Sequence, residues 1–115
     1  MAKRRRRRDR EPPPTSDYAD PDGNVLTLRQ VLSPGSIRKL GEQPASAAAS
    51  VEDAWQRREE ALFERLAVRW EISGLPIDKQ SMLLARYRMA SAEERRWVRE
   101  TIEGHLERFI PELSG

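Results

Sequence analysis

Hydrophobic residues gather in the second half of the chain and recur there at helical spacing. Four large apolar residues lie at intervals of seven, four and four: Trp55, Leu62, Leu66 and Trp70. This spacing places them on one face of an α-helix. The sequence that follows, SGLP at residues 73–76, has the glycine and proline typical of a helix end. The pattern therefore predicts a helix over residues 51–72.

Two further helices are predicted downstream. Residues 77–89 carry apolar side chains on nearly all sides, which is typical of a helix buried between neighbours. Ser91, with Glu94 three residues later, forms a capping box, so a third helix is expected to begin there and run to about Ile110. Because short connections favour antiparallel neighbours, we predict an all-α fold in which residues 51–115 form an antiparallel three-helix bundle.

A separate apolar segment, residues 25–41, precedes these helices. Thr27 with Gln30 three residues later resembles a capping box. Ser33 followed by Pro34 is typical of a helix start, because proline is tolerated at the first helical position. The pattern predicts a short helical segment of two turns.

Two other segments have the composition of flexible chain. Residues 42–50 are rich in small side chains and are predicted to be a linker, and residues 1–24 hold almost no large apolar side chain and are predicted to be a disordered basic arm. The DPDGN sequence at residues 20–24 resembles a calcium-binding loop. The EF-hand pattern, however, needs Gly at its sixth and Glu at its twelfth position, where this chain has Val25 and Val31. We interpret it as a turn.

The arm carries the clearest electrostatic signal. Residues 1–10 hold seven Lys or Arg and one Asp, a net charge of +6, so residues 11–115 carry −4 if the whole chain carries +2. The basic residues are Lys3, Arg4, Arg5, Arg6, Arg7, Arg8 and Arg10. Such a run binds phosphate without sequence preference, and we predict an anion-binding site there. Its partner is nucleic acid, an anionic membrane surface or the acidic body of the protein itself.

Composition narrows the class of protein. Hydrophobic residues make up 37% and charged residues 35% of the 115 residues, and there is no cysteine. No apolar run approaches the roughly 18 residues of a transmembrane helix, and no apolar segment follows the basic start as a secretory signal requires. We expect one cytoplasmic domain. A lone histidine without cysteine does not make a metal site, and no catalytic spacing is present, so we expect neither a cofactor nor enzymatic activity.

The apolar segment must bury its hydrophobic face, because a helix this short is marginal in water. The predicted interaction surface comprises six residues: Leu28, Leu32, Ile37, Leu40, Trp97 and Gly104. Either the segment docks on the side of the third helix that bears Trp97 and Gly104, which we favour, or both surfaces bind a protein partner or a second copy. The functional hypothesis is a non-enzymatic helical interaction module with an anion-binding arm. The alternative is a non-specific nucleic-acid-binding or ribosome-associated protein that acts through the arm.

Two polar residues fall on predicted apolar faces. Glu59 lies in the apolar stripe of the first helix. It could pair there with Arg86 or Arg95. We favour the other interpretation, that it reaches water at the edge of the stripe. His105 lies on the apolar stripe of the third helix and is predicted to be a hydrogen-bonded histidine at the edge of the core.

Two longer stretches carry a family resemblance. The sequences DYADPDGNVLTLRQVLSPGSIRKL and LLARYRMASAEERRWVRE resemble those of a family of small, uncharacterised proteins from high-GC actinobacteria. The resemblance covers most of the chain. It implies a bacterial, cytoplasmic protein, and it assigns no activity and no functional residue.

Overall fold

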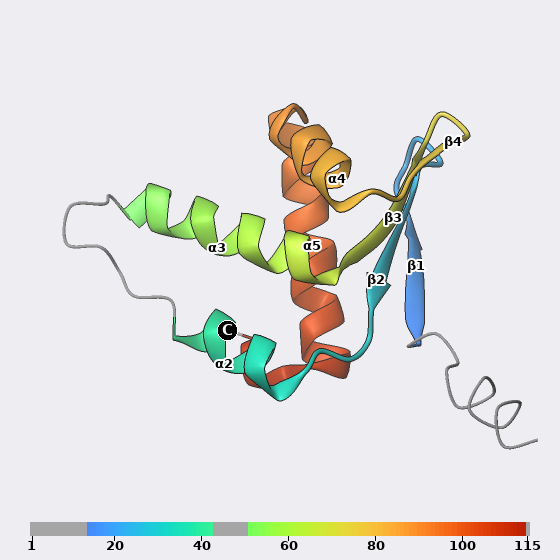
Figure 1. Ribbon diagram of the computed structural model, residues 1–115. Helices are drawn as coiled ribbons and strands as arrows, with labels where there is room; N and C mark the ends of the chain where they lie inside the picture. The colour runs from blue at the N-terminus through green and yellow to red at the C-terminus, as the bar shows by residue number, and fades with distance from the viewer. Residues whose placement is uncertain (1–13, 43–50, 115) are drawn as a thin grey trace, which may run out of the picture.

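The computed structural model describes residues 14–42 and 51–114, and at residues 51–54 it describes the backbone alone. The elements, in chain order, are β1 (Thr15–Ala19), β2 (Val25–Arg29), α2 (Pro34–Gly41), α3 (Val51–Leu66), β3 (Ala67–Ile72), β4 (Leu75–Ile77), α4 (Gln80–Arg88), α5 (Ala92–Phe109) and the 3-10 turn Pro111–Leu113. The prediction of an all-α three-helix bundle was therefore wrong. The described residues form four helices and a four-stranded antiparallel sheet in the order β1-β2-β3-β4 (Figure 1).

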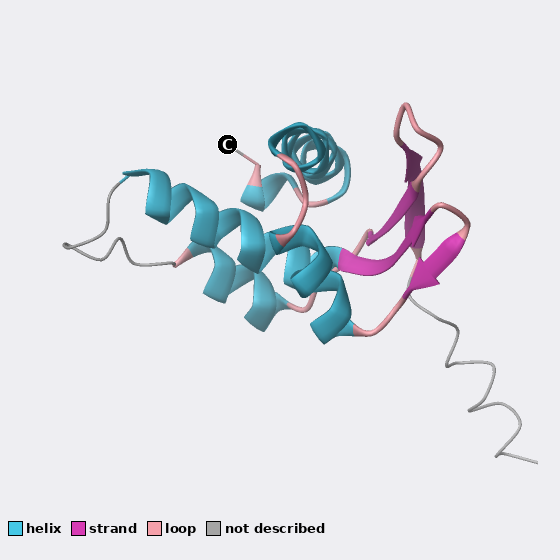
Figure 2. Ribbon diagram, turned by 90° about the horizontal axis from the view of Figure 1, so that it is seen from above, coloured by secondary structure: helices cyan, strands magenta, loops and turns pink. Residues whose placement is uncertain are grey.

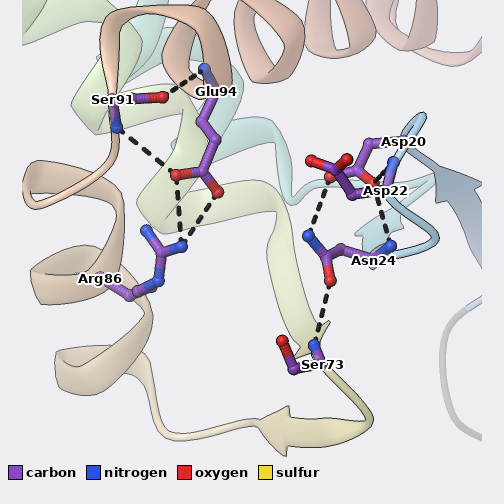
Figure 3. A network of polar contacts seen from close by, with 7 residues as sticks. All are labelled: Asp20, Asp22, Asn24, Ser73, Arg86, Ser91 and Glu94. Atoms are coloured by element: carbon purple, nitrogen blue, oxygen red, sulfur yellow. Dashed lines mark hydrogen bonds and ion pairs between the residues drawn. The ribbon is translucent and has the colours of Figure 1, made fainter.

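The first hairpin is closed by the DPDGN sequence, which is a turn as predicted. The Asp20 carboxylate accepts hydrogen bonds from the backbone N–H groups of Asp22 and Asn24, both at 2.9 Å. Gly23 adopts a positive φ of 85°, which glycine tolerates without steric cost. The turn also reaches the second hairpin, because the side-chain oxygen of Asn24 accepts a hydrogen bond from the Ser73 N–H at 3.0 Å (Figure 3).

The second hairpin replaces the end of the predicted helix over residues 51–72. Helix α3 stops at Leu66, and the chain continues directly into strand β3. Ser73 and Gly74 have φ values of 52° and 79°, the two successive positive values of a type I′ hairpin turn. The serine and glycine thus reverse a strand rather than close a helix.

The apolar segment 25–41 is half strand and half helix. The prediction of a helical turn capped by Thr27 was wrong, because residues 25–29 are strand β2 and pair with β1 and β3. The helix start at Ser33 is confirmed: its hydroxyl accepts a hydrogen bond from the Ser36 N–H at 3.1 Å, and Pro34 opens α2.

The last two helices follow the predicted pattern more closely. Helix α4 begins three residues later than expected, since residues 75–77 pair with β3. The capping box of α5 is confirmed by reciprocal hydrogen bonds, in which the Glu94 N–H donates to the Ser91 hydroxyl and the Ser91 N–H donates to the Glu94 carboxylate (Figure 3).

The core lies between the sheet and the helices. Figure 2 shows the helices on one side of the sheet. Burial alternates along β2, with Leu26 and Leu28 buried and the residues on either side of each more exposed. The largest buried side chains are Trp70, Phe63, Leu26, Leu28, Leu66, Leu106, His105 and Val98. Three of these eight come from the sheet and the other five from helices α3 and α5.

Part of the predicted arm belongs to the fold. Residues 15–19 form the edge strand β1, so the prediction of disorder over residues 1–24 was wrong for this stretch. Residues 1–13, with most of the arm, and residues 43–50, with most of the predicted linker, lie outside the described residues. Among the described helices, none has both the length and the apolar character needed to cross a membrane.

Candidate functional site

The predicted interaction surface is largely inside the protein. Leu28 and Leu40 are buried in the core, and Leu32 and Ile37 pack against it. The segment 25–41 is therefore docked on its own chain, but at a different place from the one predicted. Its strand half pairs with β3, and α2 contacts α3 and the 3-10 turn.

Trp97 and Gly104 do not form the expected docking face. Trp97 is partly buried and packs against the core. A Cβ atom added at Gly104 would meet nothing within 4 Å, so no crossing element requires a glycine there. Gly104 instead lines an open hollow on the surface of α5. The other residues that line this hollow, which we call the Gly104 hollow, are Trp55, Arg99, Glu100, Glu103 and Glu107.

A second depression adjoins the Gly104 hollow and is rich in arginine. It has a volume of about 440 Å³, and we call it the arginine groove. Its lining residues come from α3, the end of α4 and α5: Trp55, Gln56, Glu59, Glu60, Tyr87, Arg88, Ala92, Arg95, Arg96 and Arg99. Four arginines oppose two glutamates in this set, which gives the lining a formal charge of +2.

Helical geometry explains why these residues converge. The residues from α5 lie at positions 92, 95, 96 and 99, and those from α3 at 55, 56, 59 and 60. Residues three and four apart share one face of a helix. Each helix therefore presents a continuous stripe, and the two stripes form the walls of the groove.

Glu59 fixes the base of the arginine groove. Its side chain is only 15% exposed and accepts hydrogen bonds from the Arg99 guanidinium at 3.0 Å and from the Tyr87 hydroxyl at 3.1 Å. The favoured reading, that Glu59 reaches water, was wrong, and so were both predicted partners. Arg86 instead pairs with Glu94 at 2.9 Å (Figure 3).

The Glu59 contacts connect helices α3, α4 and α5. Burial, followed by the nearby carboxylate of Glu59, raises the pKa of the Tyr87 phenol far above its usual value. The hydrogen bond with Glu59 likewise raises the pKa of Arg99. Tyr87 therefore stays a neutral donor and Arg99 stays a cation, while the Tyr87 ring stacks on Phe63 with centroids 4.7 Å apart.

The rim of the groove is less constrained. Arg88 donates through Nε and Nη2 to one oxygen of Glu60, at 3.1 and 2.9 Å, and its side chain is more than half exposed. An exposed pair of this kind contributes only about 0–1 kcal/mol, so an incoming anion has little to displace. Arg95 and Arg96 form no ion pair with any residue that the structure describes.

Trp55 stands beside these arginines and is 50% exposed. The sequence pattern assigned it to the core stripe of the first helix, and that prediction was wrong. Figure 1 shows that the N-terminal end of α3 extends away from the sheet. Trp55 lies seven residues, or about 10 Å along the helix, before the first core residue of α3, Leu62. The indole is therefore free to contact a ligand.

His105 is a buried, hydrogen-bonded histidine, as the sequence predicted. It is 1% exposed. Its Nε2 donates to the backbone carbonyl of Arg29 at 2.6 Å, because a carbonyl only accepts. Nδ1 then accepts from the Tyr18 hydroxyl at 2.7 Å, and burial lowers the pKa of the imidazole. Within the described part of the chain, no three His, Asp or Glu side chains are grouped so as to hold a metal ion.

The predicted anion-binding residues, Lys3 to Arg8 and Arg10, lie outside the described residues. The chain that follows them is firmly attached. The carbonyl of Pro14, just before β1, accepts a hydrogen bond from the Gln30 N–H at 2.9 Å. The described chain is therefore attached to the sheet from its first residue, Pro14.

Comparison with protein-family models, curated proteins and solved structures finds no match in any of the three. The resemblance to an actinobacterial family stays a prediction.

Proposed function

We propose that the protein is a non-catalytic nucleic-acid-binding module that contacts phosphates through its basic arm and its arginine groove. One observation carries the proposal. Four arginines line one groove on a body, residues 11–115, whose net charge is −4. Arginine binds phosphate through a planar, multi-donor guanidinium, so the groove offers several such contacts close together.

The arm and the groove have different roles in this proposal. The arm concentrates a charge of +6 in ten residues and attracts a polyanion without sequence preference, because each neutralised phosphate releases counterions. The groove has two ion pairs that keep Arg88 and Arg99 in place, and two arginines, Arg95 and Arg96, that are available at its rim. The arm recruits the nucleic acid and the groove holds it.

The original interaction-module hypothesis loses its main support, since Leu28 and Leu40 are in the core. Glu59, the best-placed carboxylate of the groove, is engaged by Arg99 and Tyr87. These contacts favour a binding role over proton transfer. The proposal places the protein in the cytoplasm, where nucleic acid is available.

Fluorescence anisotropy with a labelled oligonucleotide tests the proposal. Four full-length proteins are compared: the wild type, an arm variant with Arg4–Arg8 replaced by Ser, the groove variant R95A/R96A, and the control R57A/R65A. The control removes the same charge from exposed residues of α3 outside the groove. Thermal unfolding verifies that each variant is folded.

The arm and groove variants are expected to bind more weakly than the control at about 50 mM salt. Losing two phosphate contacts should also reduce the slope of log affinity against log salt by about 1.4, at about 0.7 per contact for single strands. Wild-type binding that is unchanged between about 50 and 300 mM salt, or a groove variant that matches the control, would contradict the proposal.

Self-association is a second candidate function, favoured by an uncovered face of α4. Met82 in α4 and Met89, the residue that directly follows α4, are 53% and 82% exposed and lie seven residues apart. Exposed apolar residues of this kind are found at protein interfaces. Sedimentation velocity over a range of concentrations should then show a dimer that M82K/M89K abolishes. A wild type that sediments as a monomer at all concentrations would exclude this function.

A further inference from the structure

We propose that the arginine groove binds single-stranded nucleic acid, with one unstacked base on the indole of Trp55 and its phosphates on Arg95 and Arg96. This inference rests on the proposed function and adds the form of the ligand. Three observations carry it: the exposure of Trp55, the arginines beside it, and the acidic residues that close one end of the site.

Among the residues that the structure describes, Trp55 belongs neither to the core nor to the side chains packed against it. The apolar side chains that α3 contributes to the core, Leu62, Phe63 and Leu66, lie in its second half. Trp55 is half-exposed and lines both the arginine groove and the Gly104 hollow. Its indole therefore stands at the boundary between the two depressions, where an aromatic ring can stack on a base.

The aromatic contact decides between single and double strands. In a duplex the faces of the bases are covered by their neighbours, and only backbone and groove edges are accessible. Arginines alone would bind the phosphates of either form. An exposed tryptophan between them adds a contact that only an unstacked base can make, so the site should prefer single strands.

The charge pattern along α5 sets the direction and length of the site. Beyond Arg99, the Gly104 hollow is bordered by Glu100, Glu103 and Glu107, and these carboxylates repel phosphate. The strand must therefore run from Trp55 towards Ala92. The seven residues from Ala92 to Arg99 span about 10 Å at about 1.5 Å per residue. A site of this length holds only a short stretch of an unstacked strand.

The test compares W55A and W55F with the wild type, all as full-length proteins. The ligands are a labelled oligothymidine of about 15 nucleotides, a duplex of the same length, and polyglutamate as an acidic polypeptide. W55F keeps an aromatic face and serves as the matched control. Because Trp55 lies outside the core, both variants are expected to unfold at the wild-type temperature.

We expect W55A to weaken binding of the oligothymidine about 5-fold or more, the lower end of base–aromatic stacking. W55F should recover most of this loss, and duplex binding should change less than about 2-fold, because the duplex contacts only the arginines. The oligothymidine should also quench wild-type tryptophan fluorescence more than that of W55F. Together these results would support the inference.

Other outcomes overturn it in distinguishable ways. If W55A binds the oligothymidine as the wild type does while R95A/R96A binds it weakly, the inference fails and the proposed function stands. Equal losses on single strands and duplex would make Trp55 a general structural residue, which also refutes the inference. Tighter binding of polyglutamate than of either nucleic acid, or no binding of nucleic acid by the wild type, would refute both proposals.

Discussion

Replacing Tyr18 by Phe should destabilise the fold through the hydrogen bond that it removes. Tyr18 lies on the edge strand β1, and its hydroxyl donates to Nδ1 of His105 on α5 at 2.7 Å. Nε2 of the same imidazole is bonded to the carbonyl of Arg29 on β2. His105 therefore connects the last helix to the first two strands. Phe retains the edge-to-face ring contact, whose centroids are 5.6 Å apart, so the change isolates the hydroxyl.

The expected cost follows from the burial of His105. With the hydroxyl gone, Nδ1 is an acceptor without a partner on a side chain that is 1% exposed. Leaving a buried polar group unsatisfied costs about 1–3 kcal/mol, more than the net value of an average hydrogen bond. For a domain of this size each kcal/mol lowers the melting temperature by about 4–8 °C. The variant should therefore melt about 4 °C or more below the wild type.

Urea and thermal unfolding of the full-length protein measure this loss. T27V is the matched control, because the Thr27 hydroxyl donates to the Asp17 carboxylate at 2.7 Å on the exposed face of the same hairpin. Water replaces that bond, so T27V should cost less than about 0.5 kcal/mol. Equal stability losses in Y18F and T27V would show that water reaches Nδ1, and the reasoning from burial would fail.

Three further predictions concern stability. W70A should lower the free energy of unfolding by about 3–5 kcal/mol in urea titrations, since Trp70 is 1% exposed and its loss leaves a large cavity; a loss below about 2 kcal/mol would contradict its place in the core. G104A should raise the stability by about 0.5–1 kcal/mol, because a helix-interior glycine is replaced and the new Cβ meets nothing within 4 Å; a lower melting temperature would refute this. Burial lowers the pKa of His105 in the folded state, so the unfolded chain binds the proton first and stability should fall as pH drops below about 6.5. H105Q should flatten this dependence between about pH 7.5 and 5.5, and an unchanged pH profile would exclude His105 as its source.

Local chemistry was readable from the sequence. The capping box of Ser91 and Glu94, the helix start at Ser33 and the turn at residues 20–24 are all confirmed. Each depends on hydrogen bonds between residues no more than four positions apart. Such contacts form whenever the backbone takes the local conformation, whatever the rest of the chain does.

The strands were missed because their signal is ambiguous over short distances. Leu66 and Trp70 are four residues apart, which puts them on the same face of a helix and equally on the same face of a strand. Ser73 and Gly74 likewise fit a helix end or a hairpin turn. The choice depends on the pairing of β3 with β2, in which Trp70 lies opposite Leu26, a partner 44 residues earlier in the chain.

The candidate site was readable only in part. The spacing of Arg95, Arg96 and Arg99 already places them on one helical face, and this signal was available in the sequence. Their position beside Trp55 could not be predicted from the sequence, because the helical period of α3 places Trp55 on the same face as its core residues. Whether a residue on that face is buried depends on how far the neighbouring elements extend along the helix.

The sequence by itself determined the helix caps at Ser33 and Ser91, the turn at residues 20–24, the extent of α5 and the charge contrast between arm and body. Tertiary structure alone decided the sheet, the pairing of Glu59 with Arg99 and the exposure of Trp55. The reason is physical. Helix ends and turns satisfy their backbone hydrogen bonds with neighbours in sequence. A strand pairs with residues from a distant part of the chain. A groove likewise needs a second wall, from a segment that only folding brings close.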